Sequence, residues 1–158
     1  MCKAYLVSKH DRLVSMRIRK LNHSVYQVQY HLVWGTKYRR KFLKYYVKTE
    51  LIKALYQTQR RHPAIYIHNV NTGDDHVHMQ IEIPPTYPIP AIIRDMKTYS
   101  SAHLRKRFPF INRMYIDSGI WGTGYFISTI GLNEANICKY IDNQNTDDRG
   151  SDVTSEFS

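Results

Sequence analysis

Residues 76–83 (HVHMQIEI) alternate polar and apolar side chains without interruption. Because successive side chains of a β-strand point to opposite faces of a sheet, this alternation predicts a strand that is buried on one face only. The apolar face carries Val77, Met79, Ile81 and Ile83, and the polar face carries His76, His78, Gln80 and Glu82. The chain must therefore build a core against one side of a sheet and leave histidines on the other side.

The two histidines of this strand form a candidate metal site. His76 and His78 are two residues apart, so their imidazoles lie on one face and can converge on one metal ion. Neutral imidazole is a common metal ligand. The competing interpretation is a pair of ordinary surface histidines, since the chain contains 8 histidines.

The periodicity of apolar residues outlines the other elements. It predicts strands over 26–34, 64–70 and 123–131, and helices over 44–61, 90–107 and 133–144. Residues 109–122 are expected to form a loop rich in aromatic side chains. The order β-α-β-β-α-β followed by a helix predicts an α+β fold, with a ferredoxin-like (RRM-like) antiparallel sheet and two helices on one of its faces.

The 158 residues are enough for one compact domain. We expect a basic extension over 1–22, the folded domain over 23–147 and a polar, disordered tail over 148–158. No apolar run has the length of a membrane span, and the apolar patch at Ala4–Val7 is too short for a signal peptide. These features predict a cytoplasmic protein with no membrane partner. The two cysteines of the chain provide no disulfide framework.

A net charge of +10 and 13 tyrosines favour a polyanionic partner, with nucleic acid first. Tyrosine rings stack on bases, and arginine guanidinium groups pair with phosphates. Charge alone does not identify an enzyme, because many nucleic-acid-binding proteins are equally basic.

Tyr140 is the candidate nucleophile on the final predicted helix. Ile137 and Ile141 mark the apolar stripe of that helix, whereas Tyr140 lies to its side and shares a face with Gln144, four residues later. A phenol outside the core and next to an amide suits metal-assisted nucleophilic attack. The competing interpretation is a tyrosine on the flank of a helix that packs against a neighbouring element.

Several segments in a fixed order resemble one family. They are YHLVWGTKYRRKFL (30–43), DDHVHMQIEIPP (74–85), SSAHLRKRF (100–108), IWGTGYFISTIG (120–131) and ICKYIDNQ (137–144). The chain resembles the single-tyrosine HUH transposases of the insertion-sequence 200/605 group, in which HUH denotes histidine, a bulky apolar residue and histidine.

The resemblance implies a role for each matching residue. His76 and His78 match the paired metal ligands, Gln144 matches a third ligand, and Tyr140 matches the nucleophile that holds a 5′-phosphate covalently. It further implies Mg²⁺ or Mn²⁺ as the metal, single-stranded DNA with hairpin ends as the substrate, and a homodimer whose tyrosine helix can complete the partner's site. The expected activity is cleavage and rejoining of single-stranded DNA.

Two basic stretches are the candidate DNA contacts. They comprise Lys37, Tyr38, Arg39, Arg40 and Lys41, and Arg105, Lys106 and Arg107. Solvated surface charge is the competing interpretation for both stretches.

Three other functions remain open at this stage. A domesticated relative could cut palindromes or initiate replication with the same chemistry. A non-catalytic nucleic-acid-binding module on the same fold would instead display aromatic residues on the open sheet face. A zinc hydrolase would need a third histidine, which could only be His31, His62, His68 or His103.

Overall fold

A computed structural model describes residues 19–21, 24–26 and 28–130 of the chain. The helix expected over 133–144, with Tyr140 and Gln144, lies outside the described residues, as do the predicted tail and most of the predicted N-terminal extension.

A short antiparallel ladder joins β1 (Arg19–Leu21) to β2 (Ser24–Tyr26), with Arg19 opposite Tyr26. The alternating pattern from Tyr26 onward predicted one strand over 26–34. That boundary was wrong, because Tyr26 pairs within the small ladder and the strand of the main sheet begins at Tyr30. Alternation shows that residues are extended, but it does not show which strand they pair with.

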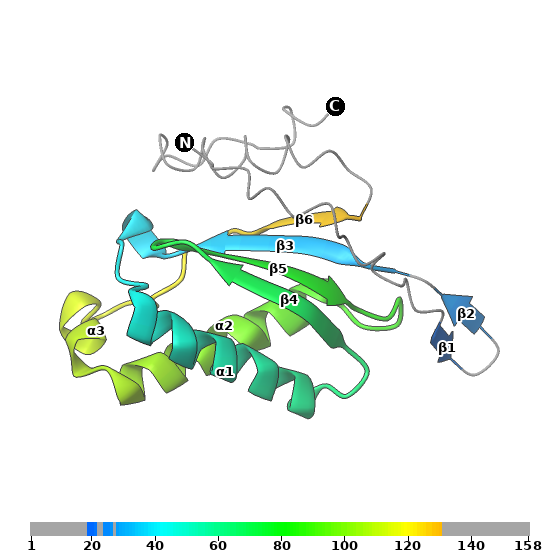
Figure 1. Ribbon diagram of the computed structural model, residues 1–158, viewed down its shortest axis with the longest axis horizontal. Coiled ribbons are helices and arrows are strands. Elements are labelled where there is room, and N and C mark those ends of the chain that lie inside the picture. The colour runs from blue at the N-terminus through cyan, green and yellow to red at the C-terminus, as the bar shows by residue number, and fades with distance from the viewer. Residues whose placement is uncertain (1–18, 22–23, 27, 131–158) are drawn as a thin grey trace. The chain divides into compact units, whose positions relative to one another are not determined.

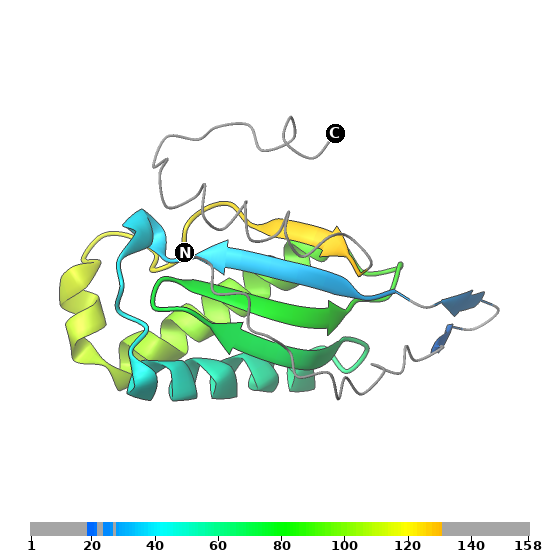
Figure 2. The same ribbon diagram turned by 45° about the horizontal axis from the view of Figure 1, so that its top comes forward.

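Four strands form the main sheet: β3 (Tyr30–Gly35), β4 (Tyr66–Thr72), β5 (His76–Glu82) and β6 (Phe126–Thr129). Their spatial order is β4-β5-β3-β6, and all neighbours are antiparallel (Figure 2). The strand with the two histidines is therefore central, with a partner on each side.

The long helices α1 (Tyr45–Arg61) and α2 (Ile89–Arg107) lie on the same face of this sheet (Figure 1). Each helix turns an apolar stripe towards the sheet, and Pro90 lies in the first turn of α2, where its missing N–H costs no hydrogen bond. Pro63 follows the end of α1 and prevents its continuation.

The core lies between the helices and the apolar face of the sheet. Its fully buried side chains come from both layers and include Leu32, Trp34, Met79 and Ile81 of the sheet and Leu51, Leu55, Ile93 and Met96 of the helices. The rings of Trp34 and Trp121 meet edge to face with centroids 6.0 Å apart, which joins the segment after α2 to this core.

Within residues 28–130 the order β-α-β-β-α-β agrees with the sequence prediction, and the structure is an α+β fold with a four-stranded antiparallel sheet. The expected loop over 109–122 was wrong in its first part, since Pro109–Met114 forms the short helix α3. Pro109 has the fixed φ of a first helical residue and Ile111 is buried, so two local features support a helix that six residues of periodicity could not reveal.

Among the described residues, no helix combines the length and the apolar character needed to cross a membrane.

Replacing Leu55 by alanine should lower the free energy of unfolding by about 2–5 kcal/mol, because it leaves a cavity under α1 where Leu55 is 0% exposed. Tyr45→Ala on the same helix is the matched control. Tyr45 is 86% exposed, so its loss should change the free energy by less than about 0.5 kcal/mol. Urea unfolding of the two variants tests this placement, and similar losses in both would contradict it.

Candidate metal site and active site

His76 and His78 lie on the sheet face opposite α1 and α2. In the β3–β5 ladder His78 is directly opposite Val33, and His76 is opposite Gly35. The neighbouring core-facing positions of β5 are Val77 and Met79, both of which are buried. Both histidines therefore lie on the polar face of the sheet, as the alternating sequence pattern predicted.

His31 lies beside His78. The Nε2 atom of His78 is 3.3 Å from Nδ1 of His31, and the two ring centroids are 5.5 Å apart. Burial, together with the charges of His31 and His76, lowers the pKa of His78 to about 4. His78 is therefore neutral near pH 7, which is the state in which an imidazole can bind a metal ion.

His76 is held by the carboxylate of the preceding residue. Its Nδ1 atom is 2.8 Å from Oδ1 of Asp75. An ionised carboxylate only accepts hydrogen bonds, so Nδ1 carries the proton and donates it. This tautomer leaves the lone pair of Nε2 available as a metal ligand.

The polar face continues away from the two histidines as a hydrogen-bonded row. Gln80 donates to Gln29 at 3.1 Å, and Gln29 donates to Glu82 at 3.3 Å. The same Glu82 oxygen is 2.7 Å from Nε2 of His68. Glu82 is only 3% exposed, and these partners satisfy the buried carboxylate.

The other candidate histidines are paired with acidic residues elsewhere. His62 lies 3.0 Å from Asp95, His103 lies 3.0 Å from Glu50, and His68 contacts Glu82. Of the four histidines considered as a third zinc ligand, the structure brings only His31 next to the pair.

The donor set fits a divalent metal ion that is bound in part by the protein and in part by water. Within residues 19–21, 24–26 and 28–130, no group of three histidine, cysteine or acidic side chains is arranged to hold a metal ion. His76 and His78 supply two nitrogens, so a third protein ligand has to be of another type or come from another part of the chain. Gln144, an amide outside the described residues, meets both conditions.

The first basic stretch divides into inward and outward side chains. Tyr38 and Arg39 have positive φ values of 60° and 51°, so the backbone turns sharply there. The guanidinium of Arg39 forms an ion pair of 3.3 Å with Asp75, and its side chain is 15% exposed. Lys41 is exposed, and Arg40 lies over the rings of Tyr38 and Tyr115 with distances of 5.5 and 4.9 Å to their centroids.

The second basic stretch divides in the same way. Arg105 donates to the carbonyl oxygen of Tyr115 at 3.1 Å, to that of Ser118, and to Oδ1 of Asn112 at 3.1 Å. Its guanidinium holds the segment after α3, whereas Lys106 and Arg107 are exposed. DNA contact by these residues stays a prediction, and Arg39 and Arg105 have internal partners for their charge.

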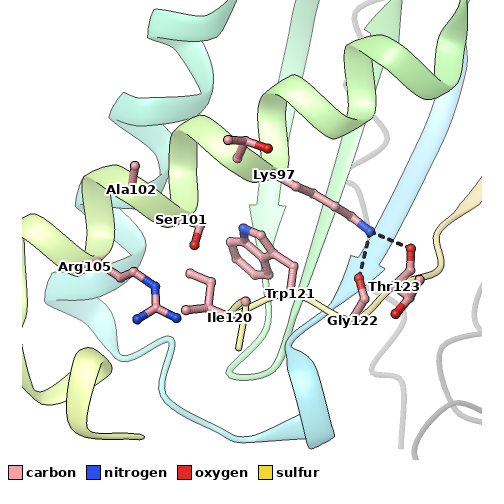
Figure 3. Close-up of a pocket in the computed structure, with 10 residues that line it drawn as sticks. Lys97, Ser101, Ala102, Arg105, Ile120, Trp121, Gly122 and Thr123 are labelled. Atoms are coloured by element: carbon pink, nitrogen blue, oxygen red, sulfur yellow. Dashed lines mark hydrogen bonds between the residues drawn. The ribbon is translucent and has the colours of Figure 1, made fainter. Parts of the chain in front are cut away.

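A cavity of about 430 Å³ lies between α2 and residues 119–123 (Figure 3). Lys97 extends along its edge, and its Nζ donates to the carbonyl oxygens of Gly122 at 2.9 Å, Thr123 at 3.3 Å and Gly124 at 2.8 Å. Burial lowers the pKa of Lys97 to about 8. Both cations of this cavity, Lys97 and Arg105, thus hold backbone carbonyls and serve the structure of the loop.

Sequence reasoning gave Gly73 and Asp75 no functional role and placed Arg39 among the candidate DNA contacts. The available signal was an acidic residue immediately before His76 in a basic chain, because a carboxylate next to a candidate ligand can fix its tautomer.

Comparisons with known proteins identify the family of the chain. The model of the family "Transposase IS200 like" matches residues 24–144, so the chain belongs to the IS200-like transposase family, whose members are DNA-binding proteins of transposition.

Two curated relatives are similar over most of the chain. The transposase for insertion sequence element IS200 of Salmonella typhimurium is 29% identical over 131 residues, which cover 83% of this chain and 86% of that relative. The ISDra2 transposase TnpA of Deinococcus radiodurans is 27% identical over 133 residues, covering 84% and 94% of the two chains.

The fold agrees with that of a solved relative. The crystal structure of a Deinococcus radiodurans protein assigned as a transposase has a TM-score of 0.73 and 27% identity, and it covers 80% of this chain and 97% of the other. The four-stranded antiparallel sheet and its helices match that structure.

The lowered pKa of His78 predicts how stability depends on pH in metal-free protein. The folded-state pKa of about 4 lies below the unfolded value of 6.5, so between these values only the unfolded state takes up the proton. The contribution of His78 to the free energy of unfolding is therefore fully present above about pH 6.5 and is lost as the pH decreases towards 4. The loss attributable to this one group is up to about 3 kcal/mol.

Urea unfolding at about pH 7 and about pH 4 checks this, with His78→Gln as the comparison. The wild-type protein should lose more stability than the variant between the two conditions. Equal losses would show that His78 titrates normally in the folded protein.

Proposed function

We propose that this transposase cleaves and rejoins single-stranded DNA at the ends of an insertion sequence through a covalent 5′-phosphotyrosine intermediate. The observation that carries the proposal is the pair His76 and His78 on one face of the central strand β5, in a chain of the IS200-like family. The lowered pKa of His78 favours its neutral, metal-binding form. The hydrogen bond from Nδ1 of His76 to Asp75 leaves Nε2 as the ring nitrogen of His76 that could bind a metal ion.

Tyr140 is the proposed nucleophile. Its phenolic oxygen attacks the phosphorus of a phosphodiester, the bond from phosphorus to the 3′-oxygen breaks, and the 5′-phosphate remains on the tyrosine. The departing strand gains a proton and ends in a free 3′-hydroxyl. That hydroxyl, or another one, later attacks the phosphotyrosine and restores a phosphodiester, so the sequence of steps needs no external energy source.

A phenol with an ordinary pKa near 10 is a poor nucleophile without activation. A bound divalent ion supplies that activation by polarising a phosphate oxygen. His76, His78 and Gln144 are the proposed ligands, and Mg²⁺ or Mn²⁺ is the proposed metal. Two imidazoles and one amide leave coordination positions for water and for phosphate oxygens.

The proposed substrate is single-stranded DNA with hairpin ends, bound in the cytoplasm by a homodimer. Support comes from the net charge of +10 and from cations that point outward in both basic stretches, such as Lys41, Lys106 and Arg107. Tyr38 is 60% exposed and lies beside Lys37 and Arg40, which suits stacking on an unpaired base next to a phosphate.

The residues on the histidine-bearing face of the sheet also argue against a protein that only binds nucleic acid. A nucleic-acid-binding module of this architecture displays aromatic residues on its central strands. In the described strands β3 and β5, the positions on the histidine face are occupied by His31, Val33 and Gly35, and by His76, His78, Gln80 and Glu82.

Tyr140→Phe should abolish the covalent protein–DNA adduct and leave binding of DNA nearly unchanged, because only the nucleophilic oxygen is removed. The assay uses single-stranded oligonucleotides from the DNA that flanks the gene, with Mn²⁺, followed by denaturing electrophoresis. Tyr45→Phe is the control, since Tyr45 is an exposed tyrosine of α1. An adduct of full yield with Tyr140→Phe would assign the nucleophile to another tyrosine.

A further inference from the structure

The turn that leads into β5 is fastened to the segment Thr36–Leu43, which follows β3. The backbone N–H of Thr36 donates to the carbonyl oxygen of Asp75 at 2.8 Å, and the Thr36 hydroxyl donates to the same oxygen at 3.2 Å. The N–H of Leu43 donates to the carbonyl oxygen of Asp74 at 2.9 Å. The backbone before His76 therefore has little freedom to move.

Arg39 crosses from this segment to the turn. Its guanidinium reaches Oδ2 of Asp75, at 3.3 Å, by passing directly over Gly35. A Cβ atom at Gly35 would lie 2.4 Å from Nη1 of Arg39, so any larger residue at this position would displace the guanidinium. Gly35 is also the residue opposite His76 in the ladder, which brings Arg39 and His76 to the same corner of the sheet.

The carboxylate of Asp75 uses its two oxygens for two partners. Oδ2 pairs with Arg39, and Oδ1 accepts the hydrogen bond from Nδ1 of His76. The Asp75 side chain is 10% exposed, so both interactions are shielded from water. The ion pair orients the carboxylate, and the carboxylate oxygen that accepts from Nδ1 fixes the tautomer of His76.

The imidazole of His76 lies on Gly73. A Cβ atom at Gly73 would be 2.3 Å from Cε1 of His76, 2.6 Å from Nδ1 and 2.9 Å from Nε2. These three ring atoms occupy the space that the Cβ of any other residue at position 73 would fill. Gly73 is needed here for close approach of the ring.

We propose that Arg39, Asp75 and Gly73 are positioning residues for the metal ligand His76: Gly73 admits the ring, Asp75 fixes its tautomer, and Arg39 holds Asp75. This inference rests on the proposed function, because it assumes that His76 binds the metal. It also reassigns Arg39 from DNA contact to support of the metal site. Loss of such a supporting partner typically weakens metal binding about 10- to 100-fold.

The test is calorimetric titration of the full-length chain with Mn²⁺. Gly73→Ala moves the ring without changing any charge, and Asp75→Asn removes the carboxylate while keeping its shape. Each should weaken Mn²⁺ binding about 10- to 100-fold. Arg39→Gln should weaken it in the same direction and leave metal-free binding of single-stranded DNA unchanged.

Two matched controls accompany these variants. Gly119→Ala introduces a Cβ that meets no described atom within 4 Å, and Lys41→Ala removes an exposed cation two residues after Arg39. Both should bind Mn²⁺ like the wild-type protein. Melting followed by circular dichroism confirms that each variant is folded under the titration conditions.

The outcomes separate this inference from the proposed function. If His76→Ala loses Mn²⁺ binding while folded Gly73→Ala and Asp75→Asn bind it with wild-type affinity, the positioning role is wrong and the metal site stands. If His76→Ala binds Mn²⁺ as the wild type does, the metal site itself is wrong, and both proposals fail. Weakened DNA binding by Arg39→Gln without a change in Mn²⁺ affinity would return Arg39 to the DNA contacts.

Discussion

The antiparallel pairing of β3 with β5 is the interaction on which the candidate site depends. Its register runs from Tyr30 opposite Ile81 to Gly35 opposite His76. A slip of one residue would turn Met79 and its apolar neighbours away from the helices and bring the histidines into the core. Burial of the apolar face therefore fixes the register, and the register in turn places His31 next to His78 and Gly35 under Arg39.

The segment after β3 contains a run of basic residues that the sequence pattern assigns to one purpose, although their side chains have different surroundings. The positive φ values of Tyr38 and Arg39 reverse the backbone, so Arg39 turns inward to Asp75, whereas Lys41 is exposed. Arg40 lies between these extremes, because its guanidinium packs over Tyr115 and donates to the carbonyl oxygen of Met114. Under the proposed function, one short run of cations would both support the proposed metal ligand His76 and contact DNA. This division explains how a chain with 23 basic residues can use some of them as internal structural groups.

The sequence predicted correctly those helices and strands whose apolar residues recur with a clear helical or strand period. The alternation over 76–83 identified β5, and apolar stripes identified α1 and α2 to within a residue or two. The short helix α3 was missed because six residues contain too little periodicity. The ion pair of Arg39 with Asp75 was missed because it joins residues 36 positions apart and depends on the register and on a left-handed backbone. Tyr140 and Gln144 were identified only through angle and resemblance, and their placement stays a prediction.

The most direct test of the metal site is an anomalous difference map from crystals of the protein grown with Mn²⁺. The account predicts one strong peak within coordination distance of a ring nitrogen of both His76 and His78, with Nε2 as the ligand atom of His76, because its Nδ1 donates to Asp75. A Mn²⁺ peak that contacts neither histidine, or one held by Nδ1 of His76 after the bond to Asp75 has broken, would contradict it.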